Sequence, residues 1–276
     1  MLKRVLVGVI FVPLIVLLVL FAPAWGVACF VALITACASW ELLRATAKTP
    51  VWIHVLTSAA AAVLPLGFLL GDRGGVVTMG FTALALFAIL FVHAILAYGT
   101  ERAMNYETIQ KCLFAGILMP AFLSTLVVLM NYGTEGHGRM YVMMTIGLAF
   151  ITDGGAYFAG VLLGKHRGLT QVSPNKSTEG YVGGLATGVI FTVVFGIVVQ
   201  NAFGVAVSYP ALVAYGLVGA LVTEIGDLAF SLIKREYGVK DYGNLLPGHG
   251  GIMDRFDSMV FCAPLVTLFS LCFPCF

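Results

Sequence analysis

Long apolar runs separated by short polar segments dominate this chain. Nine runs are each close to the roughly 20 residues that cross the hydrocarbon core of a bilayer as a helix. They cover residues 5–22, 26–43, 51–70, 76–97, 112–130, 140–162, 181–200, 208–230 and 258–275. The last run contains Pro264 and Pro274, which membrane helices tolerate. The pattern predicts an all-α integral membrane protein with about nine transmembrane helices.

The basic residues between these runs predict an orientation. With the N-terminus placed in the cytoplasm, 13 of the 15 Lys and Arg residues fall in cytoplasmic segments, and only Arg73 and Arg139 fall in outer loops. Cytoplasmic loops of membrane proteins carry such an excess of positive charge. A missed helix would move the basic residues of all later loops to the opposite side of the membrane. The 13-to-2 distribution therefore supports the helix count too. We therefore expect a multi-pass protein of the cell's inner (plasma) membrane.

Composition leaves no room for a separate soluble domain. The 276 residues are 60% hydrophobic and 10% charged, whereas soluble domains are about half apolar and a quarter charged. The longest polar connections are residues 99–111, 163–180 and 231–257, all cytoplasmic in this topology. We divide the chain into an N-terminal region of about five spans, 1–130, and a C-terminal catalytic region, 131–276, with its active site at the cytoplasmic membrane face. Nothing in the composition indicates a nucleic-acid partner.

The segment from Ser231 to Asp257 reads SLIKREYGVKDYGNLLPGHGGIMDRFD and concentrates charge between two apolar runs. Its acidic residues can hold a metal ion, and its basic residues can hold phosphate. Its glycines allow a backbone to approach a phosphate closely. This combination at a membrane surface predicts phosphoryl-transfer chemistry on a lipid.

Three carboxylates inside predicted spans stand out, because an ionisable group there marks a functional site by default. They are Asp153, Glu224 and Asp227, and the last two are three residues apart on one helix face. Each could instead pair with a basic residue of another helix; both interpretations stay open for Glu224, and function is favoured for Asp227. If a helix begins near Asp254, this residue and Asp257 also share a face. Asp227 and Asp254 could then meet and hold Mg²⁺, which takes oxygen ligands and substrate phosphates.

A second polar cluster, GKHRGLTQVSPNKSTEG, occupies the 163–180 connection. Its hydroxyls, amide and Lys176 suit a phosphate or a nucleotide. A structural alternative is a capped turn, in which Ser177 or Thr178 caps the following helix and Glu179 lies in its first turn. Both interpretations can hold at once.

These segments resemble a known family. The pattern S-x-x-K-R-x(4)-K-D-x(4)-L-P-G-H-G-G-x(2)-D-R-x-D, from Ser231 through Asp257, is similar to the signature of the phosphatidate cytidylyltransferases, also called CDP-diacylglycerol synthases. The ITDGGAYFAG run around Asp153 agrees as well. SPNKSTEG resembles the family's S-P-x-K-[ST]-x-E-G, although Ser177 and Thr178 stand where the family often has Thr-Trp. The N-terminal spans resemble the family only in hydropathy.

The resemblance implies that CTP and phosphatidic acid react to give CDP-diacylglycerol and pyrophosphate. It also implies a divalent ion, usually Mg²⁺, together with a monovalent cation such as K⁺, and a homodimer. Asp227 and Asp254 match the metal-binding aspartates of the family. The phosphatidate phosphate is already anionic near neutral pH, because the second ionisation of comparable monoesters has a pKa of about 6, so a dedicated base is not required.

The predicted site has two groups of residues. The catalytic group holds metal, binds phosphates or orients those residues, and comprises Asp227, Asp254, Lys234, Arg235, Lys240, Asp241, Arg255 and Asp257. The substrate-binding group comprises Asp153, Ser173, Lys176, Glu179, Ser231, His249, Gly250 and Gly251.

Other functions would also fit a chain of this hydropathy. A CTP-dependent transferase could act on another lipid or a polyprenol acceptor. A transporter could also carry intramembrane carboxylates, but it would show internal repeats and charge at mid-membrane. A structural membrane scaffold would leave the charged 231–257 segment without a purpose.

Overall fold

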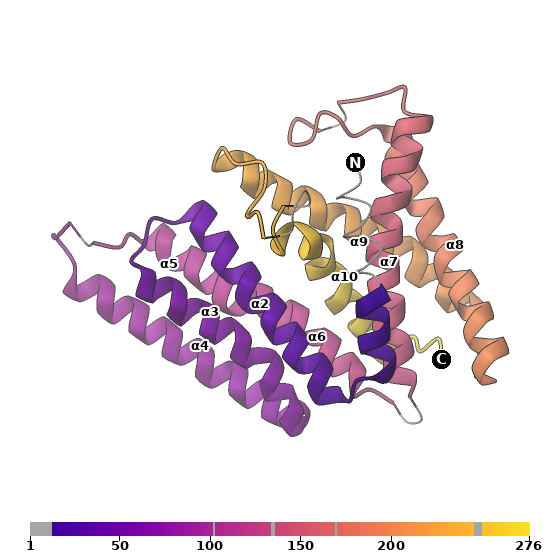
Figure 1. Ribbon diagram of the computed structural model, residues 1–276, viewed down its shortest axis with the longest axis horizontal. Helices are drawn as coiled ribbons and strands as arrows, with labels where there is room; N and C mark the ends of the chain where they lie inside the picture. Colours follow the sequence, from indigo (N-terminus) through magenta and orange to yellow (C-terminus); the bar gives the residue numbers. More distant parts are fainter. Residues whose placement is uncertain (1–12, 102, 134–135, 169, 246–249) are drawn as a thin grey trace. The chain divides into compact units, whose positions relative to one another are not determined.

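The computed structural model describes residues 13–101, 103–133, 136–168, 170–245 and 250–276 (Figure 1). Over these ranges the protein is mainly helical, and Arg167 and Ser177 form an isolated antiparallel β-bridge. Residues 13–21 of the first predicted span are helical. His249, predicted to bind substrate, lies outside the described residues.

The chain folds as two compact units that are not consecutive halves. The first unit contains the chain up to Asn131 together with Val239–Phe256, and the second contains Tyr132–Gly238 and Asp257–Phe276. The first unit is thus interrupted after Asn131, and the predicted division into a five-span region and a catalytic region stays a prediction. The chain then returns to the first unit, because residues 239–256 belong with the N-terminal helices.

Helices of the first unit pack along one another (Figure 1). They are α2 (Ala24–Thr46), α3 (Val51–Gly67), the 3-10 turn η1 (Phe68–Leu70), α4 (Gly71–Leu96), α5 (Tyr106–Leu113), the π-turn η2 (Phe114–Leu118) and α6 (Met119–Met130). The chain reverses between α3 and α4 at Gly71, whose φ of 81° favours glycine. Asn105 begins α5 by accepting a hydrogen bond from the Thr108 N–H at 2.9 Å.

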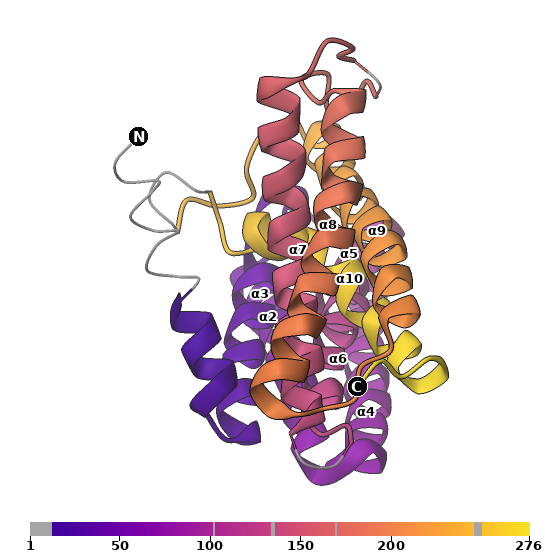
Figure 2. The same cartoon turned by 90° about the vertical axis from the view of Figure 1, so that its right-hand side faces the viewer.

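The second unit is built on α7 (His137–Leu162), α8 (Thr178–Phe203), α9 (Tyr209–Glu236) and the part of α10 (Met253–Cys272) that follows Phe256. Figure 2 shows α7, α8 and α9 side by side. Small residues recur at every fourth position of α8, all buried: Gly180, Gly184, Gly188, Thr192 and Gly196. Small residues let membrane helices approach closely. The approach is tight, since a Cβ added at Gly188 would lie 2.7 Å from the Ala220 Cβ on α9.

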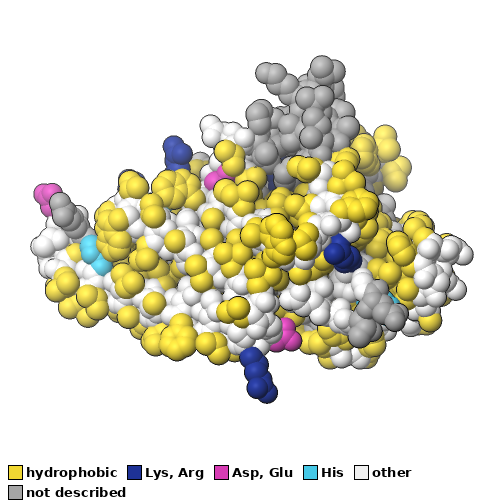
Figure 3. Space-filling model, turned by 60° about the horizontal axis from the view of Figure 1, so that its bottom comes forward, with side chains coloured by type: hydrophobic (Ala, Val, Ile, Leu, Met, Phe, Trp, Pro, Cys, Tyr) yellow, Lys and Arg dark blue, Asp and Glu magenta, His cyan; other side chains and the backbone are white. Residues whose placement is uncertain are grey.

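Seven helical stretches of the described chain are long and apolar enough to cross a membrane. One of them, Val51–Leu96, contains both α3 and α4 and so covers two predicted spans. Large apolar side chains such as Phe81, Leu84 and Ile190 are exposed. The face in Figure 3 is largely apolar with few charges. The protein is thus an all-α, multi-pass membrane protein; the count of nine spans and the cytoplasmic N-terminus stay predictions.

Candidate active site

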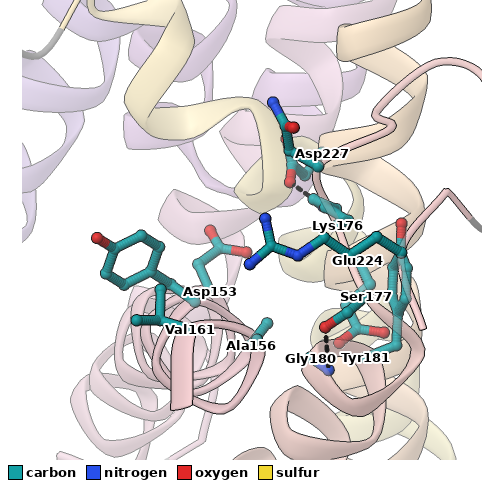
Figure 4. A pocket seen from close by; sticks show the side chains of 13 residues that line it. Asp153, Ala156, Val161, Lys176, Ser177, Gly180, Tyr181, Glu224 and Asp227 are labelled. Atoms are coloured by element: carbon teal, nitrogen blue, oxygen red, sulfur yellow. Dashed lines mark hydrogen bonds and ion pairs between the residues drawn. The ribbon is translucent and has the colours of Figure 1, made fainter. Parts of the chain in front are cut away.

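A cavity of about 410 Å³ lies within the second unit, where α7, α8, α9 and the 163–177 connection meet. Figure 4 shows residues that line it, with Lys176 beside Asp227 and Ser177 beside Gly180. Three predicted site residues line the cavity: Asp153 from α7, Lys176 from the connection and Asp227 from α9. The remaining lining includes Ala156, Tyr157, Gly160, Val161, Arg167, Asn175, Ser177, Gly180, Tyr181 and Glu224. The cavity thus joins cationic groups and carboxylates inside a mainly apolar wall.

An ion pair between Lys176 and Asp227 lies at the centre of this arrangement. The Lys176 Nζ donates to Asp227 Oδ2 and lies 5.3 Å from the centroid of the Tyr181 ring. Burial alone would lower the pKa of Lys176, but the adjacent Asp227 carboxylate outweighs it, and the net pKa lies above the usual value. Lys176 is therefore a fixed cation across the neutral range. Sequence analysis left open whether Asp227 pairs with a basic residue, and the structure shows that it does.

The connection before α8 is held by local hydrogen bonds. Ser177 is the N-cap of α8, and its Oγ accepts from the Gly180 N–H at 3.1 Å. Glu179, in the first turn, pairs with the His166 Nδ1 at 2.6 Å. The capped-turn interpretation is confirmed, and Ser177 also lines the cavity. Glu179 thus anchors His166 to the first turn of α8. The Ser177 cap fixes the backbone next to Lys176.

Other carboxylates gather around the same end of α9. Asp153 Oδ2 accepts from Ser258 Oγ at 2.9 Å. Glu224 is buried against α8, where a Cβ added at Gly184 would lie 2.2 Å from Oε1. That Oε1 has no hydrogen-bond partner among the described residues. The cavity is therefore lined by three carboxylates, those of Asp153, Glu224 and Asp227.

The basic residues that end α9 make contacts within the protein. Lys234 Nζ lies 3.8 Å from Asp257 Oδ2, and these side chains are only 10% and 8% exposed. Arg235 Nε donates to the Val172 carbonyl at 3.4 Å, which ties the connection to α9. The structure thus gives Lys234 and Arg235 positioning contacts. Ser231, predicted to bind substrate, donates to Asp227 Oδ1 at 3.4 Å.

The rest of the predicted site belongs to the first unit: Lys240, Asp241, Gly250, Gly251, Asp254 and Arg255. Asp254 is buried, and its Oδ2 accepts from the backbone N–H groups of Tyr242 at 2.8 Å and Gly251 at 2.9 Å. Lys240 and Asp241 are exposed. The backbone carbonyl oxygen of Ser173 accepts a hydrogen bond from the Lys176 N–H at 3.1 Å. Ser173 does not line the cavity. The prediction that Asp227 and Asp254 hold one metal ion stays a prediction.

The donor chemistry of the cavity fits a magnesium ion. The described residues contain no group of three or more His, Cys, Asp or Glu side chains placed to hold a metal. Magnesium does not need such a cage, because it is usually bound by one or two carboxylates together with substrate phosphates and water. Asp227 lines the cavity and supplies a carboxylate ligand of that kind.

Sequence reasoning missed some of these residues. Arg167 enters the prediction only as one of the 13 basic residues in cytoplasmic segments, yet it lines the cavity. Tyr181 and Asn175 carry no distinctive signal, although both adjoin the SPNKSTEG run. Glu41 lies near the end of the second apolar run, 26–43, and has no role in the predicted site. It is buried and accepts a hydrogen bond from the Met253 N–H at the start of α10.

Comparison with known proteins agrees with this chemistry. Residues 2–273 match the model of the cytidylyltransferase family. A phosphatidate cytidylyltransferase of Bacillus subtilis (strain 168) is 34% identical over 193 residues, which cover 68% of each chain. Phosphatidate cytidylyltransferases of Staphylococcus saprophyticus and Staphylococcus haemolyticus are 41% and 40% identical over 137 residues, half of this chain and 51% of theirs. The chain therefore belongs to the cytidylyltransferase family.

Proposed function

We propose that this protein is a phosphatidate cytidylyltransferase, which converts CTP and phosphatidic acid into CDP-diacylglycerol and pyrophosphate. A phosphate oxygen of phosphatidate attacks the α-phosphorus of CTP. The bond from that phosphorus to the oxygen bridging the β-phosphorus breaks, and pyrophosphate leaves with the bond electrons. The observation that carries the proposal is the cavity in which Lys176 meets Asp227, Asp153 and Glu224.

The main obstacle to this reaction is the repulsion between two polyanions. Lys176 and Arg167 line the cavity and can offset phosphate charge. Lys176 is held by Asp227 at the position where a phosphate would need it, so little reorganisation is required when a phosphate binds. The phosphatidate phosphate is ionised near neutral pH, so the cavity needs no general base.

A magnesium ion would be held by Asp227 together with substrate phosphates and water. When bound, it would neutralise charge on the triphosphate and on the departing pyrophosphate. The residues of the chain have separate tasks. Asp227 orients Lys176, Ser258 orients Asp153, and the Ser177 cap fixes the connection beside them.

The membrane setting extends the proposal. The active site faces the cytoplasm, where CTP is present, and the protein resides in the inner membrane with its lipid substrate. The acyl chains remain in the bilayer while the head group reaches the cavity, whose wall is mostly apolar. A homodimer and a monovalent cation such as K⁺ complete the proposed state.

Acceptor specificity separates the proposal from its rivals. Purified protein in detergent would be given CTP labelled in the α-phosphate with phosphatidate, a polyprenyl phosphate or dolichol, one at a time. We expect label in CDP-diacylglycerol with phosphatidate alone. Label transferred to a polyprenyl acceptor instead would support a transferase of different specificity. No transfer of α-label to any lipid would contradict a cytidylyltransferase function. A parallel assay with CTP labelled in the γ-phosphate would then separate a phosphotransferase from a transporter or a scaffold.

A further inference from the structure

The buried carboxylate of Glu41 contacts the first residues of α10, far from it in sequence. Glu41 lies near the end of α2 and is 8% exposed. Its Oε2 accepts the backbone N–H of Met253, the first residue of α10, at 2.8 Å. The first N–H groups of a helix lack partners within the helix, so Glu41 caps α10 from another helix.

Two glycines are packed directly on this carboxylate. A Cβ at Gly243 would lie 2.5 Å from Glu41 Oε1, and one at Gly251 would lie 2.2 Å from Oε2. Neither glycine has the positive φ that would itself demand glycine. The absence of a side chain at these positions is therefore explained by the close approach of Glu41.

A second carboxylate completes the arrangement from within the segment. Asp254 Oδ2 accepts from the N–H groups of Tyr242 and Gly251. Glu41 and Asp254 together satisfy backbone donors on both described parts of the signature segment, 239–245 and 250–256. Charged acceptors of this kind form stronger hydrogen bonds than neutral ones.

We propose that Glu41 is a positioning residue for the reaction: it caps α10 and thereby fixes the place of Asp254 and Arg255. This proposal rests on the proposed function, since those residues are expected to serve the transfer. Glu41 itself need not touch CTP or lipid. Its effect passes through the backbone N–H of Met253, the first residue of α10.

The first test compares Glu41→Ala and Glu41→Gln with the wild type by turnover and by hydrogen exchange of the 239–256 amides. Gln keeps one oxygen that can accept the Met253 N–H, so we expect the order Glu, Gln, Ala in both measurements. Misplacing a reacting group by about 1 Å can cost about 10²-fold in rate, so a loss of at least about tenfold is expected for Glu41→Ala. Glu107→Gln is the matched control, because Glu107 is an exposed glutamate of the same unit paired with Lys111.

Hydrogen exchange separates failure of this proposal from failure of the proposed function. Loss of turnover with unchanged protection of the Met253 and Tyr242 amides would contradict a positioning role. Loss of protection with unchanged turnover would contradict its importance for the reaction. A wild type without cytidylyltransferase activity would overturn the proposed function, while amide exchange would still show whether Glu41 holds the segment.

A double-mutant cycle tests the packing directly. Gly243→Ala alone should lower turnover and protection, because its methyl group would overlap Glu41. In the Glu41→Ala background that space is vacant, so adding Gly243→Ala should cause little further loss. Gly80→Ala, where an added Cβ meets no atom within 4 Å, is the control and should match the wild type. Losses that multiply in the double variant would contradict the proposed contact.

Discussion

Two lysines of the second unit have different surroundings, so substituting each should affect turnover and stability differently. Lys176 and Asp227 are 29% and 26% exposed, so their pair should contribute only about 1 kcal/mol to stability. Lys234 and Asp257 are nearly buried, and removing one partner of a buried pair costs about 3 kcal/mol or more. The cavity-lining lysine should therefore matter more for catalysis, and Lys234 more for stability.

Lys176→Ala should lower turnover at least about tenfold, because a preorganised charge in an active site is worth several kcal/mol. Its melting temperature should stay close to that of the wild type. Lys234→Ala should lower the melting temperature clearly more. Thermal unfolding and turnover in the same detergent provide the comparison. If Lys176→Ala were the less stable of the two variants and kept full turnover, the assignment of Lys176 to catalysis and Lys234 to stability would be contradicted.

At the residue scale, sequence could propose partners but not pair them. Lys176 and Asp227 were both predicted site residues, yet they are 51 residues apart and only folding shows their contact. Ser177 was found because a cap has a local signature. Glu41 had no such signature, since its partners are backbone groups near residue 253.

At the scale of elements, α8 depends on its small residues. Gly188 is buried against α7 and α9, and an added Cβ would lie 2.7 Å from the Ala220 Cβ and 3.0 Å from the Thr152 Oγ1. Gly154, in α7, has no atom within 4 Å of an added Cβ. The two glycines therefore allow the same substitution to be compared in crowded and open surroundings.

Gly188→Ala should destabilise the second unit by about 1–3 kcal/mol, the usual cost of overpacking. Gly154→Ala should leave stability unchanged or raise it by up to about 1 kcal/mol, since alanine is the better helix former. Thermal unfolding of both variants in one detergent checks this. Equal shifts in the two would show that close packing of α8 does not limit stability.

Helix positions were largely predictable, because an apolar run is a direct signal for a membrane helix. The predicted span 208–230 corresponds to α9, which continues to Glu236 and so carries Lys234 and Arg235 on its last turn. The predicted span 258–275 corresponds to α10, which begins at Met253. The extra turns are polar, so hydropathy could not detect them.

At the scale of the whole molecule, the division into units was only half predictable. Residues 239–256 join the N-terminal helices although the preceding and following residues do not. Hydrogen bonds from this segment to Glu41 supply one physical reason. No pattern within the segment itself reveals a partner so far away in the chain.

Topology is a further prediction at this scale. An odd number of spans with a cytoplasmic N-terminus leaves Phe276 on the outer side. Alkaline phosphatase fused after Phe276 should be active, and a fluorescent protein fused there should be dark, whereas fusions in the 163–180 connection should behave oppositely. The reverse outcome at both positions would contradict the predicted orientation.

The most direct test of the central claim is pyrophosphate release by purified protein given CTP, Mg²⁺ and phosphatidate. We predict release that requires all three components and matches CDP-diacylglycerol formed one for one. Asp227→Asn, folded as judged by its melting temperature, should fall by at least about 10²-fold, as for loss of a preorganised charge. Release without phosphatidate, or an Asp227→Asn variant as fast as the wild type, would contradict the account.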